Sequence, residues 1–164
     1  MASSPKKQCS LDVNVLLDFA EGKPFARDFF GVVRDCFCPL FLSPTAFIEL
    51  ELLAEGDEPG TPFARIAIPK LPKWGVTLFN IKPVEHGYAA EFSRDLIRSG
   101  FLPEGEYNDG LILAETACME IPILVTSDDH LPSIEQKALL AKFKERSLSP
   151  ALPIAPWKIA RAVR

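Results

Sequence analysis

The sequence of 164 residues predicts a three-layer α/β/α sandwich, in which a central, mostly parallel sheet of four to five strands lies between two layers of helices. Short apolar runs typical of buried strands alternate along the chain with longer segments of helical periodicity. Such alternation is typical of βα units, which build parallel sheets covered on both faces. The composition, 48% hydrophobic and 24% charged, is that of an ordinary globular protein. We therefore expect one domain that spans residues 1–164 and buries a sizeable core.

Four apolar runs predict the strands of the sheet. Each run has the length of a strand and is bounded by proline, glycine or polar residues, which interrupt regular structure. In chain order the runs are QCSLDV (8–13), CPLFLS (38–43), VTLFNI (76–81) and PILVTS (122–127).

The expected helices begin at proline or at a capping residue, and most end at glycine. Asn14 opens the first helix, and Ser43 followed by Pro44 is an N-cap with proline at the first helical position. Residues 56–75 hold four prolines and three glycines and are expected to form a loop or a short irregular helix. In chain order the helices are expected at 14–22, after Pro24, at 43–56, 83–100, 109–121 and 133–145, and in a short C-terminal segment.

The charge and the cysteine pattern exclude some kinds of protein. A net charge of -4 argues against a protein that coats nucleic acid through bulk positive charge, but it is compatible with a nuclease whose site is acidic. The four cysteines form no CxxC pair and lie near neither histidine, which argues against zinc and predicts free thiols in a reducing compartment. Asp12 interrupts the apolar stretch behind the N-terminal lysines, and no apolar run reaches about 18 residues. We therefore expect a cytoplasmic protein that does not associate with membranes.

Four carboxylates are predicted to lie at one edge of the sheet. Asp12 ends the first strand and Asp128 follows the last of the four strands. Helices of right-handed crossovers begin at the edge where the strands end, which places Asp109 there, behind its cap Asn108. Glu49 lies about six residues into its helix, some 9 Å from the helix start. Ligands in parallel sheets bind at this carboxyl edge.

Carboxylates held this close together repel one another. Two unit charges 4 Å apart cost about 4 kcal/mol at an effective dielectric constant near 20. A divalent cation would offset this repulsion, and ligands that are all oxygen favour Mg²⁺ or Mn²⁺. Within its helix, Glu49 projects from a largely apolar row, whereas Glu51 shares its row with Glu55 and is expected to face solvent. An aspartate at a strand end or helix start is, taken singly, more often a cap than a ligand, and Glu49 is the exception. Together the four acids are compatible with a magnesium or manganese site of a kind typical of phosphoryl transfer.

At these residues the sequence resembles the PIN-domain ribonucleases of the VapC toxin kind. The matching segments are LDVNVLL (11–17), SPTAFIEL (43–50), NDGLILAETA (108–117) and LVTSDDHL (124–131). Carried over position by position, the catalytic and metal-binding acids of the family fall on Asp12, Glu49, Asp109 and Asp128.

The resemblance also suggests supporting residues near the four acids. Asn14 and Thr126 match polar positions that support the site in the family, and Asp129 could replace or assist Asp128. His130 has no second histidine at ligand spacing and is left out of the expected site. The closing stretch ALPIAPWKIARAVR (151–164) loosely resembles the last strand and helix of the family.

The resemblance implies an endoribonuclease that hydrolyses RNA phosphodiesters with Mg²⁺ or Mn²⁺. Its partners would be the RNA substrate, a cognate antitoxin of a type II toxin-antitoxin pair, and a second copy in a homodimer. The chain could instead be a catalytically inactive PIN-fold interaction module, although the presence of all four acids argues against that. A flavodoxin-like or response-regulator-like protein would also place aspartates at strand ends, but it would need a lysine after its last strands and would not explain Glu49.

Basic and aromatic side chains are candidates for contacts with RNA. Lys70, Lys73 and Trp74, in the proline-rich segment, could bind phosphate and stack on a base, and Lys23 and Arg27 flank the start of the second helix. Solvated surface charge is the commoner role of such residues and is the interpretation that we favour.

Overall fold

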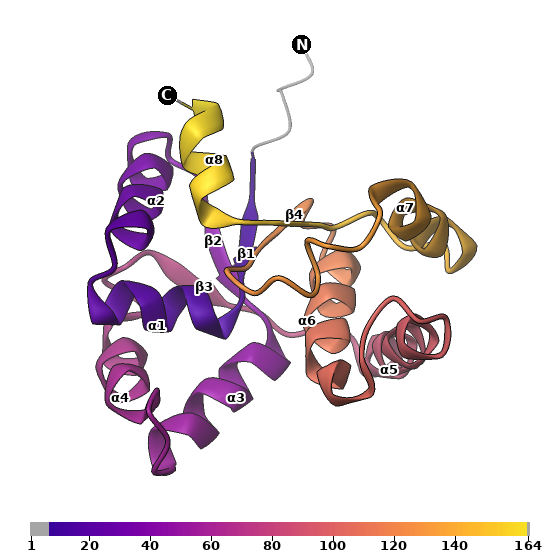
Figure 1. The fold of residues 1–164 in the computed structure, drawn as a ribbon, viewed down its shortest axis with the longest axis horizontal. Helices are drawn as coiled ribbons and strands as arrows, with labels where there is room; N and C mark the ends of the chain where they lie inside the picture. Colours follow the sequence, from indigo (N-terminus) through magenta and orange to yellow (C-terminus); the bar gives the residue numbers. More distant parts are fainter. Residues whose placement is uncertain (1–6, 164) are drawn as a thin grey trace.

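The structure, a computed structural model, describes residues 7–163 of the chain. At its centre five parallel strands lie in the order β3-β2-β1-β4-β5 (Figure 1). The predicted α/β class and the four predicted strands are confirmed, although each strand is only 3 residues long and so shorter than its apolar run. The strands are β1 (Cys9–Leu11), β2 (Leu40–Leu42), β3 (Val76–Leu78), β4 (Ile123–Val125) and β5 (Leu152–Ile154).

Helices cover both faces of this sheet. In Figure 1, α5, α6 and α7 lie together on one side and α1, α2, α4 and α8 on the other, which confirms the three layers. Helix α3 contacts both α4 and α6 and lies near the edge where the strands end. The helices are α1 (Val13–Glu21), α2 (Pro24–Asp35), α3 (Pro44–Glu55), α4 (Thr61–Lys70), α5 (Pro83–Arg98), the short 3-10 turn η1 (Glu104–Glu106), α6 (Tyr107–Cys118), α7 (Gln136–Glu145) and α8 (Pro156–Val163).

The strand order reverses at β1. The chain first adds β2 and β3 on one side of β1, then returns to add β4 and β5 on the other side. The crossover helices therefore leave the carboxyl ends of β1 and β4 in opposite directions and open a crevice between them. This switch point is the position at which open parallel sheets bind ligands.

The segment 56–75 is more regular than its composition predicts. It contains a helix of 10 residues, α4, in which Ala64 and Ala67 are fully buried. Pro62 lies in the first turn, where a missing N–H costs no hydrogen bond, whereas Pro69 lies in the last turn, where it removes one helical hydrogen bond. Packing of α4 on α1 and α3 therefore outweighs the proline content.

Two helix starts differ from the prediction. Helix α1 begins at Val13, one residue earlier than expected, because the Asp12 side chain accepts the hydrogen bond of the Val13 N–H and caps the helix. Helix α6 begins at Tyr107, directly after η1, so Asn108 lies in its first turn and does not cap it. Because it does not cap α6, the Asn108 side chain can form a hydrogen bond with a residue of another helix, α3.

The proline-rich segment near the C-terminus supplies the fifth strand. β5 pairs with β4 in parallel, with Ile154 opposite Val125, and the Thr126 N–H donates to the Ile154 carbonyl (3.1 Å). Pro153 is tolerated because β5 is an edge strand, which has a neighbouring strand on one side only.

Aromatic side chains fill the core on both faces. Phe29 on α2 is fully buried, and Phe92 on α5 stacks on Phe143 of α7 with ring centroids 4.8 Å apart. Within residues 7–163, no helix combines the length and the apolar character needed to cross a bilayer.

Candidate functional site

Asp12 lies at the centre of the carboxyl edge. β1 ends at Leu11, so the next side chain points into the crevice between β1 and β4, where it is 4% exposed. Its Oδ1 accepts from the Val13 N–H (2.8 Å), and its Oδ2 accepts from the Thr126 hydroxyl (2.9 Å). Burial raises the pKa of Asp12 to about 6, helped by the charges of Glu49 and Asp128, even though the two hydrogen bonds lower it.

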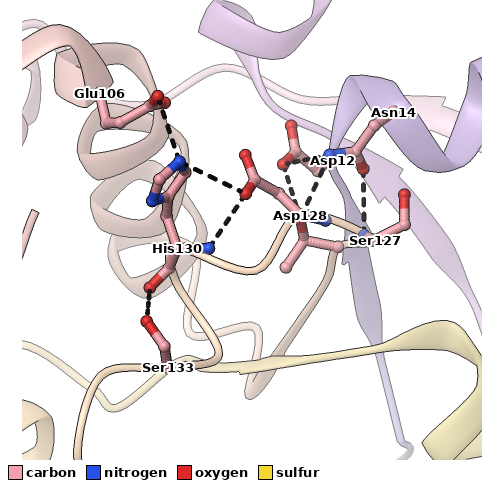
Figure 2. Close-up of polar contacts among 8 residues, drawn as sticks. Asp12, Asn14, Glu106, Ser127, Asp128, His130 and Ser133 are labelled. Carbon is pink, nitrogen blue, oxygen red and sulfur yellow. Dashed lines mark hydrogen bonds and ion pairs between the residues drawn. The ribbon is translucent and has the colours of Figure 1, made fainter. Parts of the chain in front are cut away.

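Asn14 and Thr126 join the ends of β1 and β4 around this carboxylate (Figure 2). The Asn14 amide nitrogen lies 3.5 Å from both Asp12 Oδ2 and Thr126 Oγ1, and its Oδ1 accepts from the Ser127 N–H (3.2 Å). The Thr126 hydroxyl donates to Asp12 and accepts from the Asp128 N–H (3.1 Å). Two of the three predicted supporting residues, Asn14 and Thr126, therefore contact the Asp12 carboxylate and fix its orientation.

Asp109 reaches the same crevice from the first turn of α6. Its Oδ2 is buried and accepts no hydrogen bond from the described residues. Burial raises the pKa of Asp109 to about 9, and the Asp12 charge and a side-chain hydrogen bond with Glu106, which needs a proton on one of the two carboxyl groups, raise it further. These causes favour the neutral form of this carboxyl group when no cation is bound.

A close contact between two helices sets the position of Asp109. A Cβ added at Gly110 would collide with the Ser93 hydroxyl of α5 and would lie 2.9 Å from Ser93 Cβ. The same hydroxyl donates to the Tyr107 carbonyl at the start of α6 (2.6 Å). Only glycine therefore allows the first turn of α6 to approach α5 this closely.

Glu49 comes from α3 and is half-buried. Its Oε1 accepts from the Asn108 side chain (3.0 Å), which joins α3 to the start of α6. Burial raises the pKa of Glu49, and the charges of Glu106 and Glu115 raise it further. Glu51 is exposed, as predicted.

Sequence reasoning missed Glu115, a carboxylate that holds α3 in place. It is 2% exposed and accepts from the Thr45 N–H (3.1 Å) and the Thr45 hydroxyl (2.7 Å) at the start of α3. The sequence did contain one indication of this role: Glu115 is a charged residue within the apolar run ILAETA (112–117) of α6. A charge that is buried with such a run needs a hydrogen-bonding partner.

Asp128 is the last of the four acids and lies in the loop after β4. Its Oδ1 accepts from the His130 N–H (3.0 Å), and its charge contributes to the raised pKa values of Asp12 and Asp109. Asp129 is exposed, whereas Asp128 is half-buried and turned toward the crevice. The structure thus brings the four predicted acids to one edge, with Asp128 as the member of the pair that faces the other three.

The donor set fits a hard divalent cation. The side chains in the crevice offer carboxylate oxygens, one of which, on Asp109, is buried and accepts no hydrogen bond. None of the four acids forms an ion pair with a lysine or arginine within residues 7–163. A cation would replace the missing partner of Asp109 and offset the mutual repulsion of the acids.

A groove opens beside Glu49. It has a volume of about 400 Å³ and lies between α1, α3 and the start of α6. Leu52 lies in this groove and is 63% exposed. The groove is lined by Val13, Glu49, Leu52, Leu53, Glu58 and Asn108.

Trp74 is not available at this edge to stack on a base. It lies just before β3, hence at the amino end of the sheet, together with Lys70 and Lys73. Its ring packs edge-on against Phe19 (centroids 4.7 Å apart) and is tilted against Phe30 (6.1 Å). Lys70, Lys73 and Trp74 therefore lie at the edge of the sheet opposite the candidate site.

The fold is shared with a solved structure. A chain in the crystal structure of VapBC2 from Rickettsia felis bound to a DNA fragment from their promoter matches with a TM-score of 0.61 and 15% identity, over 90% of this chain and 98% of that chain. A chain in the structure of FitAB bound to an IR36 DNA fragment matches with a TM-score of 0.49 and 16% identity, over 91% and 95%. No family model matches the sequence, and a search of curated proteins finds no match. The likeness to VapBC2 confirms the predicted PIN-like α/β fold.

Proposed function

We propose that this protein is a metal-dependent endoribonuclease that hydrolyses RNA phosphodiester bonds. The observation that carries the proposal is the crevice at the switch point, where carboxylates from four separate segments meet and one buried Asp109 oxygen has no hydrogen-bond partner. The likeness of the fold to VapBC2 supports the same assignment.

In this proposal Asp12, Asp109 and Asp128 hold the metal, directly or through water. Mg²⁺ or Mn²⁺ bound there supplies Lewis acidity, which activates a water molecule and neutralises charge on the phosphate. Thr126 and Asn14 keep the Asp12 oxygens oriented toward the crevice. The surroundings of Asp109 favour its neutral form, and a metal ligand must be deprotonated, so binding should strengthen as the pH rises.

Glu49 is assigned to metal binding or to orienting the attacking water. Burial raises the pKa of Glu49, which is the direction that favours a carboxylate acting as a general base. Asn108 fixes its position through the hydrogen bond to Oε1. An in-line attack by water would leave a 5′-phosphate and a 3′-hydroxyl, and no covalent intermediate is expected.

The proposed partners follow from the same assignment. VapBC2 was crystallised with DNA of the promoter, and we propose that this chain is the toxin of a type II pair with its own antitoxin. Ile48 and Leu52 on α3 are 54% and 63% exposed beside Glu49, which makes that surface a candidate contact for such a partner. A homodimer and cytoplasmic activity are part of the proposal.

A cleavage assay on labelled RNA with Mg²⁺ or Mn²⁺ tests the proposal. The wild type should cleave, and Asp12→Asn should lose activity by at least about a hundredfold, the effect expected when an electrostatic group of the site is removed. Asp57→Asn, in an exposed loop, is the matched control and should remain active. If the folded wild type cleaves no RNA with either ion, the chain is instead an inactive interaction module.

A further inference from the structure

Two cysteines meet at the edge of the sheet opposite the acidic crevice. Cys9 is the first residue of β1, and Cys38 lies just before β2. Their Sγ atoms are 3.7 Å apart, and both residues are free thiols. The Cys9 N–H donates to the Pro39 carbonyl (3.1 Å), so backbone pairing of the two segments holds the thiols next to each other.

A pocket gives small molecules access to this pair. It has a volume of about 380 Å³, and its lining includes both thiols, Lys7 and apolar side chains of α2 and α8, the two helices at that end of β1 (Figure 1). Cys9 is 2% exposed, whereas Cys38 is half-buried. A small molecule in the pocket therefore reaches the Cys38 sulfur before that of Cys9.

The two thiols differ in how readily they ionise. In its neutral form the Cys38 thiol donates to the Lys7 carbonyl (3.0 Å). A hydrogen bond from the Cys9 thiol lowers the pKa of Cys38, burial opposes this effect, and the charge of Lys7 supports it. The contact with Cys38, together with burial, raises the pKa of Cys9. An accessible thiol that ionises readily, in contact with a second thiol, is the arrangement typical of redox-sensitive cysteines.

We propose that Cys9 and Cys38 form a reversible oxidation site, at which hydrogen peroxide converts the two thiols into a disulfide. The Cys38 thiolate attacks one peroxide oxygen, the O–O bond breaks, and Cys38 becomes a sulfenic acid while the other oxygen takes up a proton and leaves as water. Cys9 then loses its proton and attacks the Cys38 sulfur, the S–O bond breaks, and the hydroxide leaves with that proton as a second water. The two thiols lose two electrons in total, and the peroxide gains them.

The bond requires only a small movement. The two sulfurs need to approach by about 1.7 Å to reach the disulfide bond length of about 2.0 Å. The disulfide would join the start of β1 to the segment before β2 and close a loop that contains α1 and α2. In a reducing compartment such a bond is transient, which suits a response to oxidants better than a permanent cross-link. The site lies away from the acidic crevice and does not rest on the proposed function.

Mass spectrometry of the folded, reduced protein after exposure to hydrogen peroxide tests the proposal. The remaining thiols are blocked with iodoacetamide after denaturation, so the oxidised wild type should carry two blocked cysteines instead of four. Its digest should contain a peptide pair that joins Cys9 to Cys38, and dithiothreitol should restore all four thiols. Cys9→Ala should leave Cys38 as a sulfenic acid that dimedone traps, because the thiol that would resolve it is missing. Thermal unfolding verifies that the variant is folded, and the wild-type link needs no variant.

Two controls separate this pair from general thiol oxidation. Cys118→Ser removes a thiol whose pKa burial raises to about 11, and it should leave the link unchanged. In the chain unfolded by guanidinium, Cys9 is almost as far along the sequence from Cys36 as from Cys38, so peroxide should give both pairings.

The decisive result comes from the folded wild type in excess peroxide. If it forms no link between Cys9 and Cys38, or if Cys38 pairs with the exposed Cys36 instead, the proposal is overturned. RNA cleavage does not enter this test, so the oxidation site and the proposed function can fail separately.

Discussion

Substituting asparagine for Asp12 should stabilise the metal-free protein at neutral pH. The carboxyl group is 4% exposed and its pKa rises from 3.8 to about 6 on folding. That difference of roughly two units, at about 1.36 kcal/mol each, means that the ionised group destabilises the folded state by about 3 kcal/mol. Asparagine has no charge, but its amide would require the Thr126 hydroxyl to reverse its hydrogen bond, at a cost of about 1 kcal/mol. The net gain of about 2 kcal/mol corresponds to a rise in Tm of about 4 to 8 °C.

The gain should depend on pH in a defined window. Because the folded pKa is raised above the unfolded value of 3.8, the protonated group contributes stability that is fully present below pH 3.8 and lost as the pH rises through about 6. The Tm difference between Asp12→Asn and wild type should therefore grow across this window and level off above it. Neutral asparagine should also lower the pKa of Asp109, since the Asp12 charge is one of the causes that raise it.

Thermal unfolding in a chelator, from pH 4 to pH 8, measures the effect. Asp57→Asn, an exposed acid in the loop before α4, is the control and should change the Tm by little at any pH. A pH-independent difference for Asp12→Asn, or a lower Tm than the wild type at pH 8, would refute the idea that a buried charge destabilises the crevice.

Three further outcomes are expected. Glu49→Gln should reduce RNA cleavage by at least about tenfold, whereas exposed Glu51→Gln should keep a cleavage rate within about twofold of the wild type. Equal losses of activity in the two variants would show that the wrong face of α3 was assigned to the site. Saturating Mn²⁺ at one hundred times Kd should stabilise the wild type by about 2.7 kcal/mol in thermal scans at constant ionic strength, and the shift should shrink strongly in Asp12→Asn; equal shifts would indicate general surface binding. Gly110→Ala should cost about 1 to 3 kcal/mol in a denaturant titration because its methyl group collides with α5, whereas Gly87→Ala, with open space around it, should be neutral or stabilising.

Local signals in the sequence were sufficient for most of the architecture. Apolar runs separated by proline and glycine indicated the first four strands, and Ser43 with Pro44 marked the start of α3 through hydrogen bonding within one turn. The place of Asp12 at a strand end, and of Asp109 near a helix start, then followed from the handedness of parallel crossovers. These features depend on a few neighbouring residues and on chain chirality, so no long-range contact is needed to infer them.

Contacts between distant segments decided what the local signals could not. α4 and β5 form despite their prolines because packing on α1 and α3, and pairing with β4, compensate for the lost hydrogen bonds. Glu115 receives its role only because α6 lies against Thr45 at the start of α3.

The sequence by itself determined the fold class and most of the order of its elements, because these depend on short-range pattern and on chain direction. The four acids of the candidate site were selected by the resemblance to a known family, among residues that strand ends and helix starts had placed at one edge. The tertiary structure alone decided the electrostatics of that site: the burial that raises the pKa of Asp12 and Asp109, and the meeting of His130 with Glu106 across 24 positions of the chain. Desolvation and charge interactions depend on everything within a few ångströms, whichever part of the chain supplies it. Such neighbourhoods exist only once the sheet and its two layers of helices have assembled.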